Sequence, residues 1–292
     1  MANSIAKFKK YVDLLDEVYQ NESKTAVLES DATLARAGAN ANEIIIPKLS
    51  MDGLGDYDRN SGYVDGSATM TNETVQFNYD RGRKFSIDNM DNEETAGLAF
   101  GKLSSEFIRT KVVPEQDAFR FAKYATEAAT KVGATLSAGT DVLAALQAAV
   151  AAMDDAQVSE ENRYLFITPA LLIAAQNVDT SKSREILGSF ADIIKVPQAR
   201  FYTAIDLKDG TSSGETAGGY AKASGGADIN FMIVEKSAVM QYTKHRVDKA
   251  ISPEDNQDAD AWIFNFREYG LADVYENKTT GIYCHYKYKA TT

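Results

Sequence analysis

Cysteine and histidine are nearly absent from this sequence of 292 residues. Cys284 is its single cysteine, and His245 and His285 are its two histidines. One cysteine cannot form an internal disulfide bond, and two histidines nearly exclude a metal site with several imidazole ligands. The first residues carry charges but no apolar stretch typical of a secretory signal peptide, so we expect an intracellular origin.

Basic residues and long apolar runs are also scarce. The chain has 31 Lys and Arg against 42 Asp and Glu, a formal net charge of −11. Because phosphate contacts depend on clusters of Lys and Arg, we expect any contact with DNA to be weak or repulsive. No stretch approaches eighteen apolar residues, so we expect no transmembrane helix. Hydrophobic residues still make up 44% of the chain, enough for the core of one large domain or two ordinary ones.

Motifs for covalent catalysis fail on their structural context. Gly210, Ser212 and Gly214 match the G-x-S-x-G pattern, but a glycine-rich loop follows the serine where a nucleophile elbow requires a helix. Cys284 and His285 are adjacent in a strand, and adjacent side chains of a strand point to opposite faces. We predict a core cysteine beside a surface histidine, and no catalytic residues.

One segment resembles the start of a calcium-binding loop, with Asp56, Asp58 and Asn60 at alternate positions. Its sixth position is Ser61 in place of glycine, and its twelfth is Ser67 in place of glutamate. The sequence therefore predicts no metal or cofactor.

The first half of the chain has the pattern of an extended structure. Residues 4–22 form an amphipathic helical pattern, and two strand-like stretches flank a polar tip at 52–66, which predicts a long hairpin. From residue 74 onward apolar side chains alternate along one side, and two arginines interrupt them. At about 3.3 Å per residue this strand of some fourteen residues would reach roughly 45 Å, so we expect it to leave its own core. The alternating residues are Val75, Phe77, Tyr79, Arg81, Arg83, Phe85 and Ile87.

The second half of the chain has a different pattern of helix and strand. Residues 93–131 are the longest helical stretch, in which Pro114 either kinks the rod or begins a second helix. Residues 133–226 alternate between helix and strand patterns and predict a compact α/β lobe, so that the whole chain is of the α+β class. The segment 209–228 contains six glycines, and we predict a mobile loop at the tip of this lobe, near a symmetry axis.

Three stretches carry a resemblance to a known family. They are "LLDEVYQNESKTAVLE", "NEIIIPKLSMDGLGDYDRNSGYVDGS" and "NYDRGRKFSIDNMDNEETAGLAFGKLSSEFIRTKVVPEQDAFRFAKYA". The chain resembles the major capsid proteins of tailed bacteriophages and prophages of low-GC Gram-positive bacteria. The resemblance implies the Hong Kong ninety-seven capsid fold, with these parts: an N-terminal arm at 1–40, an extended loop at 41–85, a peripheral domain with a long spine helix at 86–132, an axial domain at 133–235 and return strands of the peripheral domain at 236–292.

The same resemblance implies a structural protein rather than an enzyme. Subunits would assemble through hexamers and pentamers into the icosahedral head that encloses double-stranded phage DNA, without sequence-specific contact. The implied partners are other copies of the chain, a separate scaffolding protein, since the chain begins almost at once with the arm, and a portal. Assembly would take place in the host bacterial cytoplasm, and the product would be part of the virion. No lysine lies at the hairpin tip, so we predict no covalent cross-link between subunits.

Two alternatives remain at this stage. An encapsulin-type compartment has the same fold, and it would enclose cargo enzymes in place of DNA. A small-molecule enzyme could be built on the lobe at 133–229, but no convergent set of His, Cys or carboxylate residues supports it. Gel filtration separates these classes, because an enzyme forms a small oligomer and a shell protein forms very large particles.

The predicted subunit-interface residues are Arg81 and Arg83 of the long strand and Asp56, Asp58 and Arg59 of the hairpin tip. A charge on an otherwise apolar face needs a partner, and a neighbouring subunit could supply it. The competing interpretation is a bulge at residues 80–82 that turns both strand arginines outward. For the hairpin as a whole, we predict that deletion of residues 53–65 spares the fold and stops shell assembly.

Overall fold

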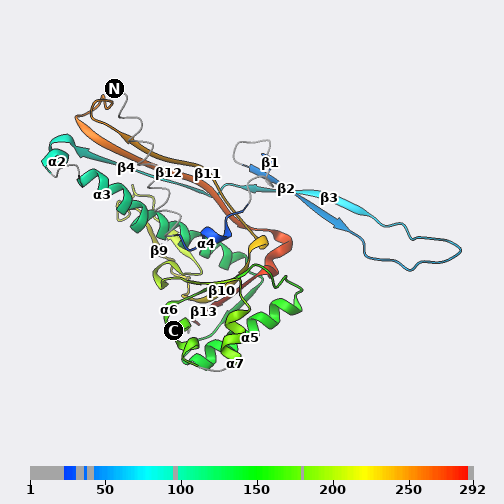
Figure 1. Cartoon of the computed structure of the whole chain (residues 1–292). Coiled ribbons are helices and arrows are strands. Elements are labelled where there is room, and N and C mark those ends of the chain that lie inside the picture. The colour runs from blue at the N-terminus through cyan, green and yellow to red at the C-terminus, as the bar shows by residue number, and fades with distance from the viewer. Residues whose placement is uncertain (1–22, 31–35, 38–42, 95–97, 179–180, 289–292) are drawn as a thin grey trace.

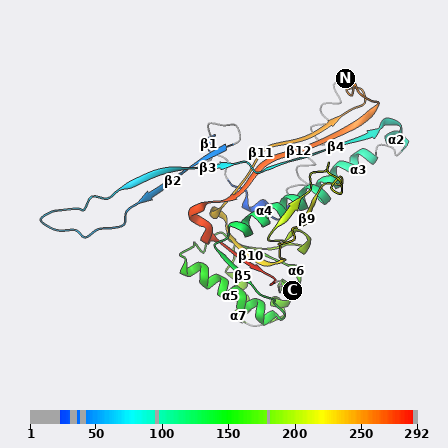
Figure 2. The same ribbon diagram turned by 180° about the vertical axis from the view of Figure 1, so that it is seen from behind.

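The computed structural model describes residues 23–30, 36–37, 43–94, 98–178 and 181–288. These residues form an elongated body, from which a hairpin projects at one end and an α/β lobe extends to one side (Figure 1). The same three parts are separate when the molecule is seen from behind (Figure 2). The amphipathic helix expected within residues 4–22 lies outside the described residues.

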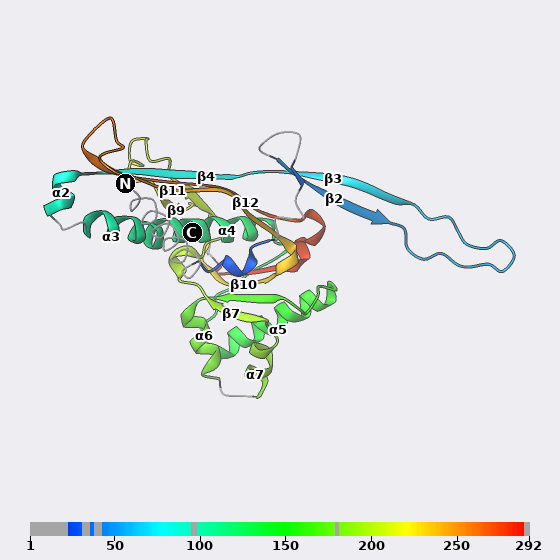
Figure 3. The ribbon, with the colours of Figure 1, turned by 45° about the horizontal axis from the view of Figure 1, so that its top comes forward.

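The projecting hairpin consists of β2 (Glu43–Met51) and β3 (Ala68–Gln76). The two strands pair antiparallel without a break, and the short β1 (Arg36–Ala37) adds to the base of β2. Among the described residues of the hairpin, those at its base belong to an apolar core that they share with the body. Its apolar residues, together with those of the body that they pack against, are Ile44, Ile46, Val75, Met240, Tyr242 and Leu271. The outer part of the hairpin extends well beyond the body (Figure 3).

The long strand predicted from residue 74 onward is two strands in two different sheets. β3 ends at Gln76, and β4 (Tyr79–Asp88) pairs with β12 (Ala261–Val274). Between them the Asn78 side chain donates to the Ala272 carbonyl at 2.8 Å and accepts from the Ala272 amide at 3.1 Å. A side chain thus replaces the ladder bonds where the chain changes sheets. The predicted alternation is correct, since the apolar positions are more buried than their neighbours.

The body is built on a sheet of three long strands in the order β11-β12-β4. β11 (Val239–Ile251) and β12 are 13 and 14 residues long, far above the usual strand of about five or six. Their antiparallel register is continuous except for one shift near residues 243–245. A sheet this long requires an equally long cover on its apolar face.

That cover is a helical stretch that follows the short α2 (Asn89–Glu94). It consists of α3 (Leu98–Phe107), a π-helical turn (Ile108–Val112) and α4 (Val113–Glu127). Pro114 lies in the first turn of α4 and lacks the amide proton that a regular α-helical bond would need. The wider turn immediately before it accommodates this loss, so the helical path continues. The predicted helical stretch through Pro114 is therefore correct, but its predicted end at residue 131 was wrong, because α4 ends at Glu127 and a strand begins at Thr130.

The α/β lobe contains a five-stranded sheet in the order β5-β13-β10-β6-β7. Its strands are β5 (Thr130–Gly133), β6 (Arg163–Ile167), β7 (Asp192–Lys195), β10 (Ile229–Glu235) and β13 (Ile282–Tyr286). The last strand of the chain therefore lies inside the lobe. The predicted division assigns residues 236–292 to the peripheral part, whereas the structure places β13 in the lobe sheet. It pairs there because β10 offers it an antiparallel neighbour between two buried layers.

Helices cover both faces of the lobe sheet. The helices α5 (Gly139–Asp155), α6 (Pro169–Gln176) and α7 (Ser181–Gly188) lie on one face, and α4 of the body covers the other. All seven residues of β10 are consequently buried. A small hairpin of β8 (Ile205–Leu207) and β9 (Tyr220–Lys222) leaves the lobe and returns toward the body.

Candidate assembly surfaces

The hairpin tip, residues 52–67, is stabilised by local backbone bonds. The Asp58 carboxylate accepts from the amides of Asn60 and Ser61 at 2.6 and 3.0 Å, and these bonds lower the pKa of Asp58, those from Ser61 contributing most. Asp58 also forms a bridge with Gly62, whose φ of 81° requires a residue without a side chain. The predicted interface residues Asp56, Asp58 and Arg59 all lie here and are exposed.

The tip is less polar than its composition suggested. Leu54, Tyr63 and Val64 are exposed by 107%, 88% and 69%, and the ring of Tyr57 lies 4.8 Å from that of Tyr63. The described chain buries little of these four large side chains. A cluster of exposed apolar groups of this kind marks a surface that contacts another molecule.

The two strand arginines both bond within their own chain. Arg81 Nε lies 2.7 Å from Oε1 of Glu115 on α4, and Arg81 also donates to the Gly219 carbonyl at 3.3 Å. Arg83 donates to the Thr216 carbonyl at 3.1 Å. The pairing of β4 with β12 is continuous through residues 80–82, so the bulge that would turn both arginines outward is absent. Whether either arginine also contacts a second subunit stays a prediction.

The glycine-rich loop between β8 and β9 lies against the body, and its predicted position at the tip of the lobe was wrong. Asp209 organises the loop: its carboxylate accepts from the side chain and amide of Ser212 and from the Thr211 amide, and these bonds lower the pKa of Asp209. Gly210 and Gly218, with φ of 78° and 66°, allow the chain to pass close to Arg83. The contacts with Arg81 and Arg83 hold the loop on the body.

A cleft of about 640 Å³ lies between this loop, β4 and the helical stretch. Six apolar side chains line it, together with several charged groups. The apolar side chains are Phe85, Leu103, Phe107, Val112, Ala217 and Phe266, and Phe107 packs edge-on against Phe85 and Phe266. The sequence did not reveal this cleft, because its three walls come from segments far apart in the chain.

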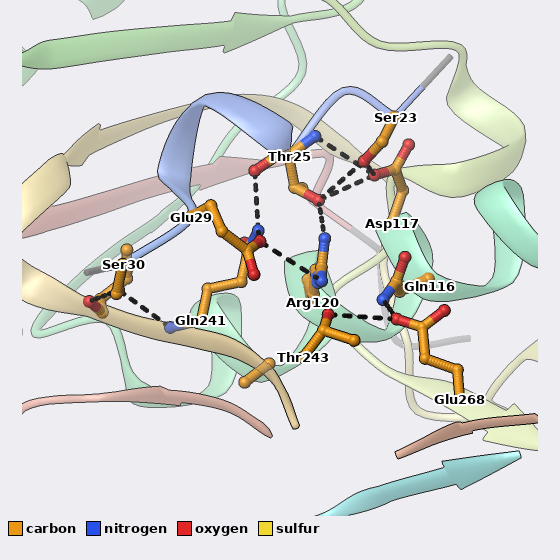
Figure 4. Close-up of polar contacts among 12 residues, drawn as sticks. Ser23, Thr25, Glu29, Ser30, Gln116, Asp117, Arg120, Gln241, Thr243 and Glu268 are labelled. Atoms are coloured by element: carbon orange, nitrogen blue, oxygen red, sulfur yellow. Dashed lines mark hydrogen bonds and ion pairs between the residues drawn. The ribbon is translucent and has the colours of Figure 1, made fainter. Parts of the chain in front are cut away.

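A buried polar cluster fixes residues 23–30, the anchor segment, to α4 (Figure 4). Asp117 is fully buried, and its carboxylate accepts from the hydroxyls of Ser23 and Thr25 and from the amides of Lys24 and Thr25 at 2.9–3.2 Å. Arg200 Nη1 lies 3.1 Å from the same carboxylate. One carboxylate thus binds the anchor segment to both the body and the lobe.

The same cluster extends from α4 to β11. Arg120 donates to the Thr25 hydroxyl at 2.9 Å and lies 3.8 Å from Glu29. Gln241, fully buried, donates to the Thr25 carbonyl and to Glu29, and it accepts from the Tyr124 hydroxyl at 3.0 Å. Desolvation raises the pKa of Tyr124 well above its ordinary value, so that this hydroxyl stays a donor. The sequence did not reveal these contacts, because Thr25 and Gln241 are 216 residues apart.

Glu268 of β12 extends this polar cluster, but only one of its two carboxylate oxygens is hydrogen-bonded within the described residues. It is fully buried, and Gln116 and Thr243 bond to its Oε1. Its Oε2 has no hydrogen-bond partner among the described residues. Desolvation raises the pKa of Glu268, and the nearby positive charges of Arg120 and Arg246 oppose this effect.

Cys284 and His285, the adjacent pair weighed as a nucleophile and base, are both buried side chains of β13. Cys284 is 1% exposed, and burial raises the pKa of its thiol to about 12. His285 is buried as well, against the prediction of a surface histidine, because β13 is covered on both faces. Its ring stacks on Phe231 at 4.9 Å and Nδ1 lies 3.0 Å from Asn230. Within the described ranges, no group of three or more His, Cys, Asp or Glu is placed to hold a metal ion. No helix in these ranges is long and apolar enough to cross a membrane.

No family model and no curated protein matches this sequence. Solved structures do match. The chain is similar to one from Gordonia phage Cozz, with a TM-score of 0.62, 11% identity and coverage of 92% of this chain and 87% of that chain. It is also similar to the mature capsid of bacteriophage PhiM1, with a TM-score of 0.61, 9% identity and coverage of 86% of this chain and 83% of that chain. A virus-like particle from Pyrococcus furiosus matches with a TM-score of 0.56, 10% identity and coverage of 96% of this chain and 99% of that chain.

The chain has a phage-capsid fold. Identities of 9 to 11% make this a likeness of fold rather than of sequence. The similarity includes most of both chains. The fold predicted from the resemblance, of the Hong Kong ninety-seven type, is confirmed, and the division into domains at residues 40, 85, 132 and 235 stays a prediction.

Proposed function

We propose that this chain is the major capsid protein of a tailed bacteriophage. Its copies assemble through hexamers and pentamers into the icosahedral head that encloses double-stranded DNA. The likeness of fold to phage capsids supports this role. The observation that carries it furthest is the projecting hairpin, which extends beyond the body with its apolar tip side chains exposed.

Such a hairpin would be only marginally stable on an isolated subunit. Two strands without a covering layer are at best marginally stable in water, and exposed apolar side chains favour association. In a shell the hairpin lies across a neighbouring subunit, which covers both its backbone and its tip. We infer that the tip residues Asp56, Asp58 and Arg59 take part in that contact, and that Arg81 and Arg83 contribute through the body surface near β4.

The remaining partners follow from charge and from the resemblance. A net charge of −11 suits a wall that holds DNA without binding it tightly, since tight binding would hinder packaging. A separate scaffolding protein and a portal would take part in assembly in the host bacterial cytoplasm, and the product would be part of the virion. The compartment-type shell is not favoured, because several of the matching structures are phage capsids.

Electron microscopy of the purified protein tests the proposal. We expect closed particles, or a precursor that assembles into them, and nuclease-resistant DNA inside particles isolated from cells. A small, soluble oligomer that never forms particles would overturn the shell role. Particles that hold enzymes in place of DNA would support the compartment instead.

A further inference from the structure

The cleft between the β8–β9 loop, β4 and the helical stretch has an aromatic floor that nothing in the described chain fills. Phe85, Phe107 and Phe266 come together there from β4, α3 and β12, and they belong to one apolar cluster of the body. A volume of about 640 Å³ is within the range of about 300–1,000 Å³ typical of small-molecule sites. A ligand with an apolar part can therefore enter the cleft and remove this floor from water, which is favourable.

Three cations line the same cleft. They are Arg83 of β4, Lys111 of the helical stretch and Lys208 of the β8–β9 loop, so each wall contributes one. No carboxylate of the described residues forms an ion pair with any of the three, whereas Arg81 beside them is paired with Glu115. Cations next to an apolar floor favour a ligand that carries a negative charge.

The acidic side chains of the cleft have contacts of their own. Glu115 pairs with Arg81 at 2.7 Å, and Glu106 pairs with Arg109 at 2.6 Å. Asp209 accepts hydrogen bonds from two amides of its own loop. These contacts offset the negative charges of the wall, so an anion in the cleft is attracted by the three cations more than it is repelled.

The guanidinium of Arg83 is held in place before any ligand binds. Its Nη2 donates to the Thr216 carbonyl at 3.1 Å, and a side chain at Gly210 would lie 2.8 Å from its Nη1. This contact uses one donor, which leaves the others for an anionic head group. Lys111 comes from the π-helical turn Ile108–Val112, and such turns are frequent at functional sites.

We propose that this cleft binds a small amphiphilic anion, a molecule with one apolar chain and a carboxylate, sulfate or phosphate head. The chain lies on the phenylalanine floor, and the head contacts Arg83, Lys111 and Lys208. The inference does not depend on the shell role, because all three walls belong to one chain. It also gives the glycine-rich loop a task, since its contact with Arg83 closes the cleft on the side of the lobe.

Titration calorimetry of the full chain with octanoate tests the site. We expect saturable binding of one octanoate per chain with a dissociation constant of about 1 mM or lower. Two matched probes, 1-octanol without the charge and inorganic phosphate without the chain, should each bind at least about tenfold more weakly. Octanoate that does not bind saturably would overturn the proposal. Equal binding of 1-octanol would overturn the anionic class, and equal binding of phosphate would overturn the role of the floor.

Charge reversal then locates the ligand. Lys111→Glu should weaken octanoate binding at least about tenfold, because its exposed side chain leaves the core unchanged while the cleft loses a cation. Lys182→Glu on α7 makes the same change of charge at an exposed site of the lobe and should bind like wild type. Circular dichroism melts show that both variants fold. Equal losses in the two variants, or none in Lys111→Glu, would overturn the assigned site.

Thiol protection tests occupancy directly. Thr110→Cys places a reactive group on the cleft wall, and the native Cys284 is buried and gives no background. We expect this thiol to react with a soluble maleimide in the free protein and to be protected by octanoate but not by 1-octanol at the same concentration. Ile173→Cys, on the exposed side of α6, should react equally with and without octanoate. A Thr110→Cys thiol that stays unreactive in the free protein would show that protein already fills the cleft, and it would overturn the proposal.

Discussion

At the scale of single residues, Asp117 carries the largest share of the anchor-segment contacts. We expect Asp117→Asn to lower the free energy of unfolding by roughly 3–5 kcal/mol, because the change leaves Arg200 and several buried donors without their charged acceptor. Urea unfolding of the unassembled subunit measures this effect. Asp80→Asn is the matched control. It removes a pair with Arg267 whose side chains are 46% and 56% exposed, and it should cost less than about 1 kcal/mol. Equal effects of the two changes would contradict a special role for Asp117.

Glu268 makes the free energy of unfolding depend on pH, and in contrast to Asp117 its charge lowers stability. Its pKa is raised in the folded state, so the unfolded chain ionises first as the pH rises. Glu268 therefore lowers stability progressively from about pH 4 up to its folded pKa, and below that window it has no such effect. We expect Glu268→Gln, which cannot ionise, to gain stability relative to wild type across this window, as measured by urea unfolding at pH 4 to 8. The exposed Glu160→Gln should follow the wild-type curve. A gain at low pH that vanishes at neutral pH would contradict the assignment.

The sequence predicted the environment of single residues only where local pattern decides it. Alternation along β4 predicted Tyr79 inside, and the structure buries it. The charge of Arg81 on the same side required a partner, but Glu115 and Gly219 could not be identified, since they are 34 and 138 residues away. His285 was misplaced for a related reason. Whether a strand is covered on one face or on two depends on distant elements, which the pattern of one strand does not reveal.

At the scale of elements, Asn78 decides where the hairpin ends and the long sheet begins. We expect Asn78→Ala to cost roughly 1–3 kcal/mol, because the amide and carbonyl of the buried Ala272 lose their partners. Hydrogen exchange at the Ala272 amide should also become faster. Asn72→Ala, at an exposed position of β3, is the control and should change neither quantity. Normal protection of Ala272 in the Asn78 variant would show that the backbone alone sets this junction.

Helices and loops that are determined by local residues were predicted well, but the elements that they contact in the fold were not. Pro114 predicted a change in the helix at the right place, and the structure adds a π-helical turn before it. The alternating stretch from residue 74 was read as one strand, because a change of partner strand leaves the alternation intact. The glycines of the β8–β9 loop predicted a loop, but its position depends on contacts with β4 that lie outside the loop's own sequence.

At the scale of the whole molecule, the body and the lobe share buried layers while the hairpin stands apart. Phe121 and Tyr124 of α4 pack against residues of the lobe sheet in one core. In the described part of the chain, the hairpin contacts the body through its base and through an ion pair between Lys48 and Glu276. The fold therefore separates stability from assembly: most of the burial lies in the body and the lobe, and the exposed tip is left for a neighbour.

Deletion of the tip tests this separation. The predicted deletion of residues 53–65 is best made as 54–65. This leaves Gly53 and Gly66 as a two-residue turn between Asp52 and Ser67, whose backbone amide and carbonyl are already bonded at 3.0 Å. We expect a normal thermal melt by circular dichroism, because the deleted residues bury almost nothing in their own chain. Particles should be absent by sedimentation and electron microscopy. A loss of even about 1–2 kcal/mol per contact lowers each association constant roughly five- to thirtyfold, and a closed shell repeats that loss at every subunit. A variant that fails to fold would show that the tip belongs to its own core, and one that assembles normally would show that the hairpin is not the contact that holds the shell together.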